Sequence, residues 1–144
     1  IFGYGNVNDG TLISLTNLVS NVGVVASDVT GVGTDRRTPG ACSYGGDKGI
    51  FGYGLGASIS SVTNLVSNSG VVASDVTGVG TARKFLTACE YGEDKGIFGF
   101  GDDGSGGAGA YVSMTNLVTN VGVVGSDVTG VGTARRGLAA CSYN

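Results

Sequence analysis

The chain has 144 residues, including 29 glycines and no histidine, and its formal net charge at pH 7 is -3. This length allows one domain, the acidic balance argues against a nucleic-acid-binding protein, and no apolar run approaches the ~20 residues of a membrane-spanning helix. The lack of histidine removes the commonest general base and metal ligand. Because the chain begins at Ile1 rather than Met, we expect a processed, excised or incomplete reading frame.

Three copies of one unit make up a single repeat domain, with approximate bounds 1–49, 50–96 and 97–144. The sequence Ile-Phe-Gly-Tyr-Gly at Ile1 recurs at Ile50 and, with Phe in place of Tyr, at Ile97. Residues 16–49 and 63–96 are identical at 26 of 34 positions. The copies differ in length only between this glycine-rich sequence and a following Thr-Asn-Leu-Val, so we expect exposed loops there, on one face of the repeat array.

The composition of each unit favours strands over helices, because Val, Ile, Thr, Tyr and Phe dominate and glycine interrupts every possible helix. An Asn-x-Gly sequence is typical of a tight hairpin turn between the second and third strands of each unit. In chain order the predicted strands are residues 1–4, 14–20, 23–30 and 40–44, then 48–53, 61–67, 70–77 and 87–91, then 95–100, 113–119, 122–129 and 139–143.

Four short strands in each unit predict an all-β fold of the β-propeller type, with three four-stranded blades in the chain. Propellers typically carry about four to eight blades, so three do not close a ring and two chains would supply six. The strand at 139–143 and the strand at 1–4 each lack a neighbour, and we expect these edges to join copies. The alternative is that the chain is half of a longer propeller. The residues assigned to closure are Ile1, Phe2, Tyr4, Cys141 and Tyr143.

The order of elements resembles the kelch-type propeller repeat over the whole chain. The matching sequence includes Arg83, the strand at 87–91, Gly99 and Gly101 in a Gly-x-Gly, a variable loop, and Arg135. The chain departs from that pattern in having Gly-x-Gly in place of the Gly doublet and no outer-strand Trp. The resemblance implies that the Ala-Cys strand is innermost and lines an axial channel. Kelch-like oxidases use copper held by histidine, which this chain lacks. The repeats also resemble Gly-rich repeats of phage-tail and metagenomic proteins.

One cysteine, one arginine and one aspartate recur at equivalent positions of every unit. Three thiols could bind a soft metal such as zinc or copper(I), but the favoured interpretation is a small apolar residue on a packed strand. The arginines could hold an anion, and we favour instead pairing with the repeated aspartates at blade junctions, where those aspartates could equally cap turns. These sets are Cys42, Cys89 and Cys141; Arg36, Arg83 and Arg135; and Asp28, Asp75 and Asp127.

The variable loops supply the candidate ligand-binding residues. Their paired polar side chains suggest calcium, which prefers oxygen ligands, but neither loop has the full spaced ligand set, so we expect a solvated glycine-rich turn and no bound metal or other cofactor. The candidates are Asn6, Asn8, Asp9, Asp102 and Asp103.

These patterns predict a non-enzymatic, self-assembling propeller that binds a partner or serves as a scaffold through loops on one face. The expected partners are a second copy of the chain and a glycan or cell-surface ligand, with no nucleic acid and no membrane span. The alternative is a purely structural component of a virion or fibre, or a designed symmetric scaffold. Either use is compatible with a virion or extracellular location.

Overall fold

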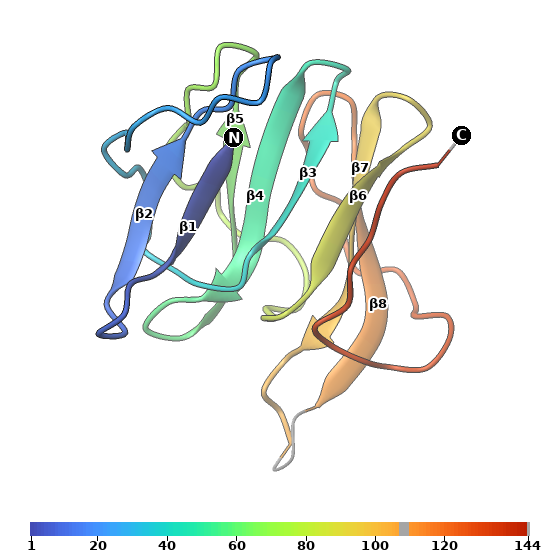
Figure 1. Cartoon of the computed structure of the whole chain (residues 1–144). Coiled ribbons are helices and arrows are strands. Elements are labelled where there is room, and N and C mark those ends of the chain that lie inside the picture. The colour runs from blue at the N-terminus through green and yellow to red at the C-terminus, as the bar shows by residue number, and fades with distance from the viewer. Residues whose placement is uncertain (107–109, 144) are drawn as a thin grey trace.

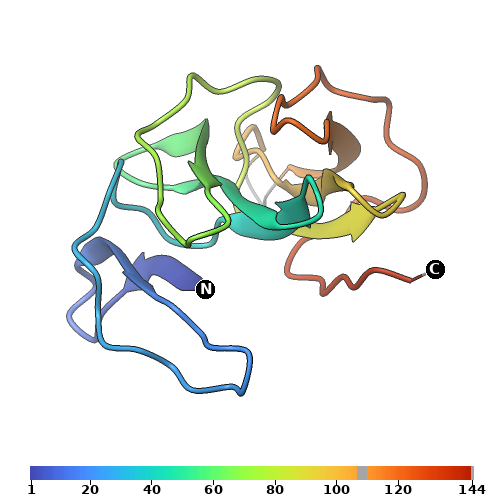
Figure 2. The same cartoon turned by 90° about the horizontal axis from the view of Figure 1, so that it is seen from above.

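The computed structural model describes residues 1–106 and 110–143, and this part of the chain contains strands and no helix. The strands form three antiparallel sheets that follow one another along an arc (Figures 1 and 2). The sheets are β1 (Phe2–Asn6) with β2 (Leu12–Asn17); β3 (Gly40–Tyr44), β4 (Lys48–Leu55) and β5 (Ile59–Val66); and β6 (Thr87–Tyr91), β7 (Lys95–Asp102) and β8 (Tyr111–Val118). The all-β class is therefore confirmed.

The two larger sheets are built in the same register, so the sequence repeat is also a structural repeat. Cys42 lies opposite Ile50 between β3 and β4, and Cys89 lies opposite Ile97 between β6 and β7. Each of these sheets begins with a strand from the end of one sequence unit and continues with strands of the next unit. The structural sheets are thus displaced along the chain from the sequence units.

A bulge interrupts the strand that each Ile-Phe-Gly-Tyr-Gly segment forms, namely β1, β4 and β7. Tyr4, Tyr53 and Phe100 have φ angles of 62°, 63° and 63°, in the left-handed region that non-glycine residues rarely adopt. The glycine that follows each of them also has a positive φ, and the strand register shifts there. Such a bulge re-aims a side chain. It turns each aromatic ring toward the connection between two sheets.

The core lies between neighbouring sheets, where aromatic side chains from one sheet meet those of the next. Tyr4 packs edge-on against Phe51 with ring centroids 5.2 Å apart, and Tyr53 packs in the same way against Phe98 at 5.1 Å. Glycine leaves room for these contacts, because a Cβ at Gly52 would collide with the Phe98 ring. Each sheet is therefore buried by its neighbour, as expected for a repeat array.

The predicted third strand of each unit is wrong. Residues 23–30, 70–77 and 122–129 run beside the preceding strand but touch it only at isolated bridges, such as Thr63 with Val76 and Val66 with Val72. The Asn64 side chain donates a hydrogen bond to the Ala73 carbonyl in this segment. A side chain that bonds the backbone in this way competes with a regular ladder. The observed sheets have two, three and three strands, not four each, and they form no closed ring.

The predicted strand at residues 139–143 is also wrong, because this segment pairs with none of the described strands. Its described residues are largely exposed, and the Tyr143 side chain is 93% accessible to solvent. Its Ser142 hydroxyl accepts a hydrogen bond from the Glu90 amide of β6. The segment therefore lies beside β6, but it lacks the hairpin partner that the equivalent strands β3 and β6 have in β4 and β7, so it joins no ladder among the described residues.

The inter-sheet aromatic contacts should carry much of the stability. Replacing the fully buried Phe98 by alanine removes its contact with Tyr53 and leaves a cavity, so Phe98→Ala should lower the free energy of unfolding by about 3–5 kcal/mol. Urea-induced unfolding followed by circular dichroism would measure this. The control Val22→Ala, at a side chain 79% exposed, should change the stability by less than about 0.5 kcal/mol. Equal effects of the two substitutions would contradict this account of the core.

Candidate functional site

The segment that connects the first sheet to the second carries a buried arginine, Arg36, which is completely inaccessible to solvent. Its guanidinium donates three hydrogen bonds: from Nε to the Tyr53 carbonyl at 2.9 Å, from Nη1 to the Thr34 carbonyl at 3.1 Å, and from Nη2 to Oδ1 of Asn64 at 2.6 Å. A guanidinium suits this role because its donors form a rigid planar fork. One side chain of the connection thereby holds both strands β4 and β5.

A carboxylate completes this arrangement on the second sheet. The Asp75 carboxylate accepts hydrogen bonds from the Thr34 amide at 3.1 Å and from the Thr34 hydroxyl at 2.6 Å. Asn64 joins the carboxylate to the arginine, because its amide nitrogen donates to Oδ1 of Asp75 at 2.9 Å while its oxygen accepts from Arg36. We call the set Thr34, Arg36, Asn64 and Asp75 an inter-sheet clasp.

The same clasp joins the second sheet to the third, with Thr81, Arg83, Asn116 and Asp127. The fully buried Arg83 donates to the Phe100 carbonyl at 2.9 Å and to Oδ1 of Asn116 at 2.6 Å, and Asp127 accepts from the Thr81 hydroxyl at 2.7 Å. Arg83 also lies 3.9 Å from the Asp127 carboxylate. The pairing expected at blade junctions therefore holds for Arg83 and Asp127 directly, and for Arg36 and Asp75 through the bridging asparagine.

Each clasp arginine also stacks on the bulge aromatic of the preceding sheet. The Cζ atom of Arg36 lies 4.1 Å from the centroid of the Tyr4 ring, and that of Arg83 lies 4.3 Å from the Tyr53 ring. Burial lowers the pKa of both guanidinium groups from the ordinary value of arginine and raises the pKa of Tyr53 to about 12. A cation above an aromatic face is stabilised by the ring quadrupole, which offsets part of the cost of burying the charge.

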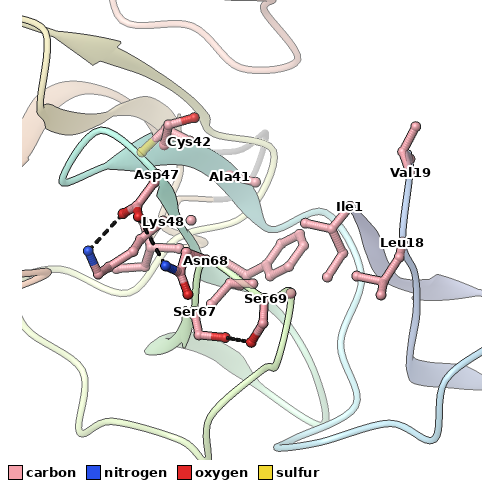
Figure 3. A pocket seen from close by; sticks show the side chains of 16 residues that line it. Ile1, Leu18, Val19, Ala41, Cys42, Asp47, Lys48, Ser67, Asn68 and Ser69 are labelled. Atoms are coloured by element: carbon pink, nitrogen blue, oxygen red, sulfur yellow. Dashed lines mark hydrogen bonds and ion pairs between the residues drawn. The ribbon is translucent and has the colours of Figure 1, made fainter. Parts of the chain in front are cut away.

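A groove of about 510 Å³ opens between the first two sheets, and its lining includes Ile1, which precedes β1, and Ile50 and Phe51 of β4. Figure 3 shows Ile1, Leu18 and Val19 on one side of it and Asp47 and Asn68 on the other. Its polar groups are already paired with one another, because the Asp47 carboxylate accepts from Lys48 at 2.8 Å and from Asn68 at 3.1 Å. These hydrogen bonds lower the Asp47 pKa.

The corresponding space between the second and third sheets is filled by β3. There the Cys42 side chain lies against Gly96, where an added Cβ would collide with the Cys42 sulfur. Burial raises the pKa of the Cys42 thiol to about 12, so it stays protonated at neutral pH, as a packed and unreactive cysteine does. Within residues 1–106 and 110–143 no group of three histidine, cysteine, aspartate or glutamate residues is placed to hold a metal ion.

The loop candidates lie at the end of the sheets where β1 turns into β2 and β7 leads into β8 (Figure 1). Oδ1 of Asp9 accepts a hydrogen bond from the Thr11 amide, which lowers the Asp9 pKa, and Asn6 donates to the Val7 carbonyl. Asn8 is exposed beside them. These loop groups are largely used in shaping their own turn.

The second pair of loop candidates is divided between the interior and the surface. Asp102 is buried, and its carboxylate accepts hydrogen bonds from the Gly104 amide and from Arg136. Asp103 accepts from the Ser105 amide at 2.9 Å. The structure does not bring these residues together with those of the β1–β2 loop in one pocket of the described residues.

The closure candidates lie on two separate surfaces. Ile1 and Phe2 are 40% and 61% exposed at the edge of the first sheet, whereas Tyr4 is buried beneath Arg36. Cys141 and Tyr143 are exposed at the opposite end of the arc (Figure 2).

Sequence reasoning named the arginines and aspartates of the clasp but missed its threonine and asparagine. The signal was present, because Thr-Asn-Leu-Val and Gly-Thr-x-Arg recur in all three units. The described part of the chain has no helix of the length and hydropathy that crossing a membrane requires.

The geometry of the buried fork should make Arg36 irreplaceable by lysine. Arg36→Lys keeps the charge but cannot satisfy three acceptors at once, so it should lower the free energy of unfolding by about 2 kcal/mol or more. Chemical denaturation would measure this. Arg37→Lys, at the exposed neighbouring arginine, is the matched control and should leave stability unchanged. A similar loss for the two variants would contradict the clasp.

Acid should loosen the clasps before it affects the apolar core. Partial burial acts to raise the pKa of Asp75 and Asp127, but hydrogen bonds from threonine and asparagine outweigh it and hold both values below 3.8. A depressed folded-state pKa stabilises the fold above the unfolded-state value, and this contribution is lost as the pH falls through the folded-state value. Unfolding in urea at pH 6 and pH 3 should therefore show a smaller acid-induced loss for Asp75→Asn than for the wild type. Equal losses would contradict this role.

No protein-family model matches this chain, and no curated protein matches it. Among solved structures, it is similar to "Novel fungal alcohol oxidase with catalytic diversity among the AA5 family, in complex with copper", with a TM-score of 0.53 and 16% sequence identity. The match covers 80% of this chain and 24% of the oxidase, so the chain spans about a quarter of that protein's length. At this identity the likeness concerns the fold alone: the chain shares an all-β arrangement with part of a larger protein.

Proposed function

We propose that the chain is a non-enzymatic module that assembles through its sheet edges into a kelch-like β-propeller, with six blades from two copies. One observation carries the proposal. The groove beside β1 corresponds to the space that β3 fills in the next sheet, where β3 has the sequence Ala-Cys-Ser-Tyr at residues 41–44. The identical sequence at residues 140–143 lies outside every described sheet. In the assembly, this segment of one copy becomes the inner strand beside β1 of another.

The β3–β4 pairing gives the register of this closure. Cys42 lies opposite Ile50 and Ala41 lies opposite Phe51. By the repeat, Cys141 of one copy lies opposite Ile1 of the other, and Ala140 lies opposite Phe2. An exposed strand edge offers the unpaired backbone groups that such strand addition uses. A unit of the same kind elsewhere in a longer chain would fit the same edge.

The assembled module would present its unequal loops on one face, as a binding scaffold. The β1–β2 and β4–β5 loops lie at the same end of their sheets (Figure 1), and loops on a rigid array are the usual place for recognition. The partner we propose is a glycan or another cell-surface ligand at an extracellular or virion location, bound by the loop candidates that solvent reaches, Asn6, Asn8, Asp9 and Asp103, while the buried Asp102 holds its turn.

A second candidate is a purely structural component of a virion, a fibre or a symmetric scaffold. It is favoured by the hydrogen bonds that Asp9, Asp102 and Asp103 already make within their own turns. A glycan array probed with the assembled protein separates the two candidates. Binding that Asn8→Ala and Asp9→Ala abolish supports the first, and an empty array supports the second.

The assembly itself is tested by native mass. The 144-residue chain should form dimers at micromolar concentration, measured by sedimentation, and the pair of substitutions Ala140→Pro and Cys141→Pro should produce monomers. Neighbouring residues of an antiparallel strand alternate in their pairing, so two adjacent prolines must remove a ladder bond. Cys141→Ala keeps both backbone amides and should still form dimers.

The thiols give a second measurement of the same closure. Cys141 is exposed and should react quickly with a thiol reagent in dilute solution, whereas Cys42 should react slowly. On assembly Cys141 enters the environment that Cys42 already has, and its reaction should slow as the protein concentration rises. A wild-type chain that stays monomeric, with Cys141 equally reactive at all concentrations, would overturn the proposal.

A further inference from the structure

We infer that the exposed faces around Arg135 and around Asn17 are the two halves of a third inter-sheet clasp, which forms between two copies of the chain. The inference rests on the proposed assembly and names a contact in it distinct from the strand closure at residues 140–143. The template is present twice within the chain, in the clasps of Arg36 and Arg83.

The donor half of the third clasp is already in its working conformation. Arg135 stacks on Phe100 with its Cζ atom 4.2 Å from the ring centroid, and its Nη1 donates to the Thr133 carbonyl at 3.1 Å. Arg36 and Arg83 make the same bond to Thr34 and Thr81, also at 3.1 Å. The three arginines differ in their other guanidinium donors, Nε and Nη2.

The Nε and Nη2 donors of Arg135 face solvent. In residues 1–106 and 110–143, Nε and Nη2 of Arg135 and the amide and hydroxyl of Thr133 have no hydrogen-bond partner. The space beside Gly132 is open as well, because a Cβ added there would meet nothing within 4 Å. At the equivalent Gly33 and Gly80 a Cβ would meet the clasp aspartate and asparagine of the next sheet.

The acceptor half lies on the first sheet. The Asn17 side chain donates to the Ala26 carbonyl at 3.1 Å and to Oδ1 of Asp28 at 2.8 Å. Asn64 makes the equivalent bonds to Ala73 and Asp75 at 3.0 and 2.9 Å. No described side chain or amide donates to Oδ1 of Asn17, the atom that in Asn64 and Asn116 accepts from arginine. Asn17 and Asp28 are thus oriented for a threonine and an arginine that this chain does not supply.

Aromatic side chains at the same two faces complete the match. Phe2 is the equivalent of Phe51 and Phe98, which pack under a tyrosine of the preceding sheet, yet Phe2 is 61% exposed. Phe100 is the equivalent of those tyrosines. Joining the halves buries Phe2 of one copy against Phe100 of the other, and places the Arg135 guanidinium at Oδ1 of Asn17 and at the Tyr4 carbonyl. The opposite charges of Arg135 and Asp28 are then neighbours.

Both halves exist on every copy, so the contact is head-to-tail and a two-copy ring contains it twice. Because the halves are held in shape by their own internal hydrogen bonds, little side-chain order is lost when they meet, which favours binding. The partner is therefore a second copy of this chain, recognised by a guanidinium, a threonine and a phenylalanine.

Sedimentation equilibrium of single variants tests the clasp. Arg135→Ala and Asn17→Ala should each raise the dimer dissociation constant by about 100-fold or more, because a charged donor or its acceptor loses its partners. Arg135→Ala also removes the bond to Thr133, and Asn17→Ala removes the bonds to Ala26 and Asp28 within the chain, so the unfolding of each isolated monomer is measured as well. The loss of affinity should exceed any loss of monomer stability. Arg37→Ala removes an exposed arginine whose side chain has no hydrogen-bond partner among residues 1–106 and 110–143. It is the matched control and should leave the dissociation constant unchanged.

Charge exchange between copies gives the sharper result. Chains with Arg135→Glu, or with Asp28→Lys, should each fail to dimerise, because both junctions then bring like charges together. An equal mixture should form heterodimers, in which one junction is native and the other pairs the two substituted side chains with opposite charge. Native mass spectrometry of the two chains, one isotopically labelled, would detect this.

The outcomes separate the inference from the proposed function. If the paired prolines at 140 and 141 abolish dimers while Arg135→Ala behaves like Arg37→Ala, the assembly stands and the clasp does not. If the mixture stays monomeric although the wild type dimerises, the clasp is again wrong. If the wild type itself is a monomer, both fail together.

Discussion

A guanidinium removed from water must have all its acceptors supplied by the protein, and this requirement organises the structure. Arg36 and Arg83 are fully buried in connections between sheets, and two of the three acceptors of each belong to the strands that follow. A buried charge without partners would cost several kcal/mol. Each sheet must therefore take one position relative to its neighbour, set by the fork of donors. The apolar and aromatic contacts supply the buried area between sheets, and the clasp sets the position of each sheet relative to the next.

Strained backbone serves the same requirement. Tyr4, Tyr53 and Phe100 adopt positive φ angles that cost energy, and each lies beneath an arginine. Strain of this kind persists where the surroundings over-determine it. The Tyr53 bulge places its ring below Arg83 and its carbonyl 2.9 Å from Nε of Arg36. One local distortion thus contributes a contact to the arginine of each neighbouring connection.

The sequence was sufficient for the all-β class, the strands of each Ile-Phe-Gly-Tyr-Gly segment and the hairpin partners beside them, because alternation and repeated glycine report directly on strands. It failed at residues 70–77, where a composition rich in valine and threonine suggested a strand. Asn64 and Asp75 divert the backbone there, and a side chain bonding to main chain leaves no periodic trace. The segment at 139–143 was misjudged for another reason: strand formation needs a partner, and composition does not say whether one is present.

The arginines could be recognised by their recurrence, but their acceptors could not be assigned without coordinates. Asn64 is 28 residues from Arg36, and Asn116 is 33 residues from Arg83, so the two spacings differ with the intervening loop. A pattern search at a fixed separation would have found one pair or the other. Only the folded chain shows that Asn64 lies opposite Phe51 and Asn116 opposite Phe98, so that both asparagines reach the same place.

Because every clasp draws its donors from one sheet connection and its acceptors from the next sheet, the two faces of each unit are independent of the number of units between them. Unequal crossing-over that gained or lost one whole repeat would leave both faces intact. Such a gene could change the size of its product in a single genetic event, with no compensating substitution at any junction. The near identity of the copies is what a recent history of that kind would leave behind.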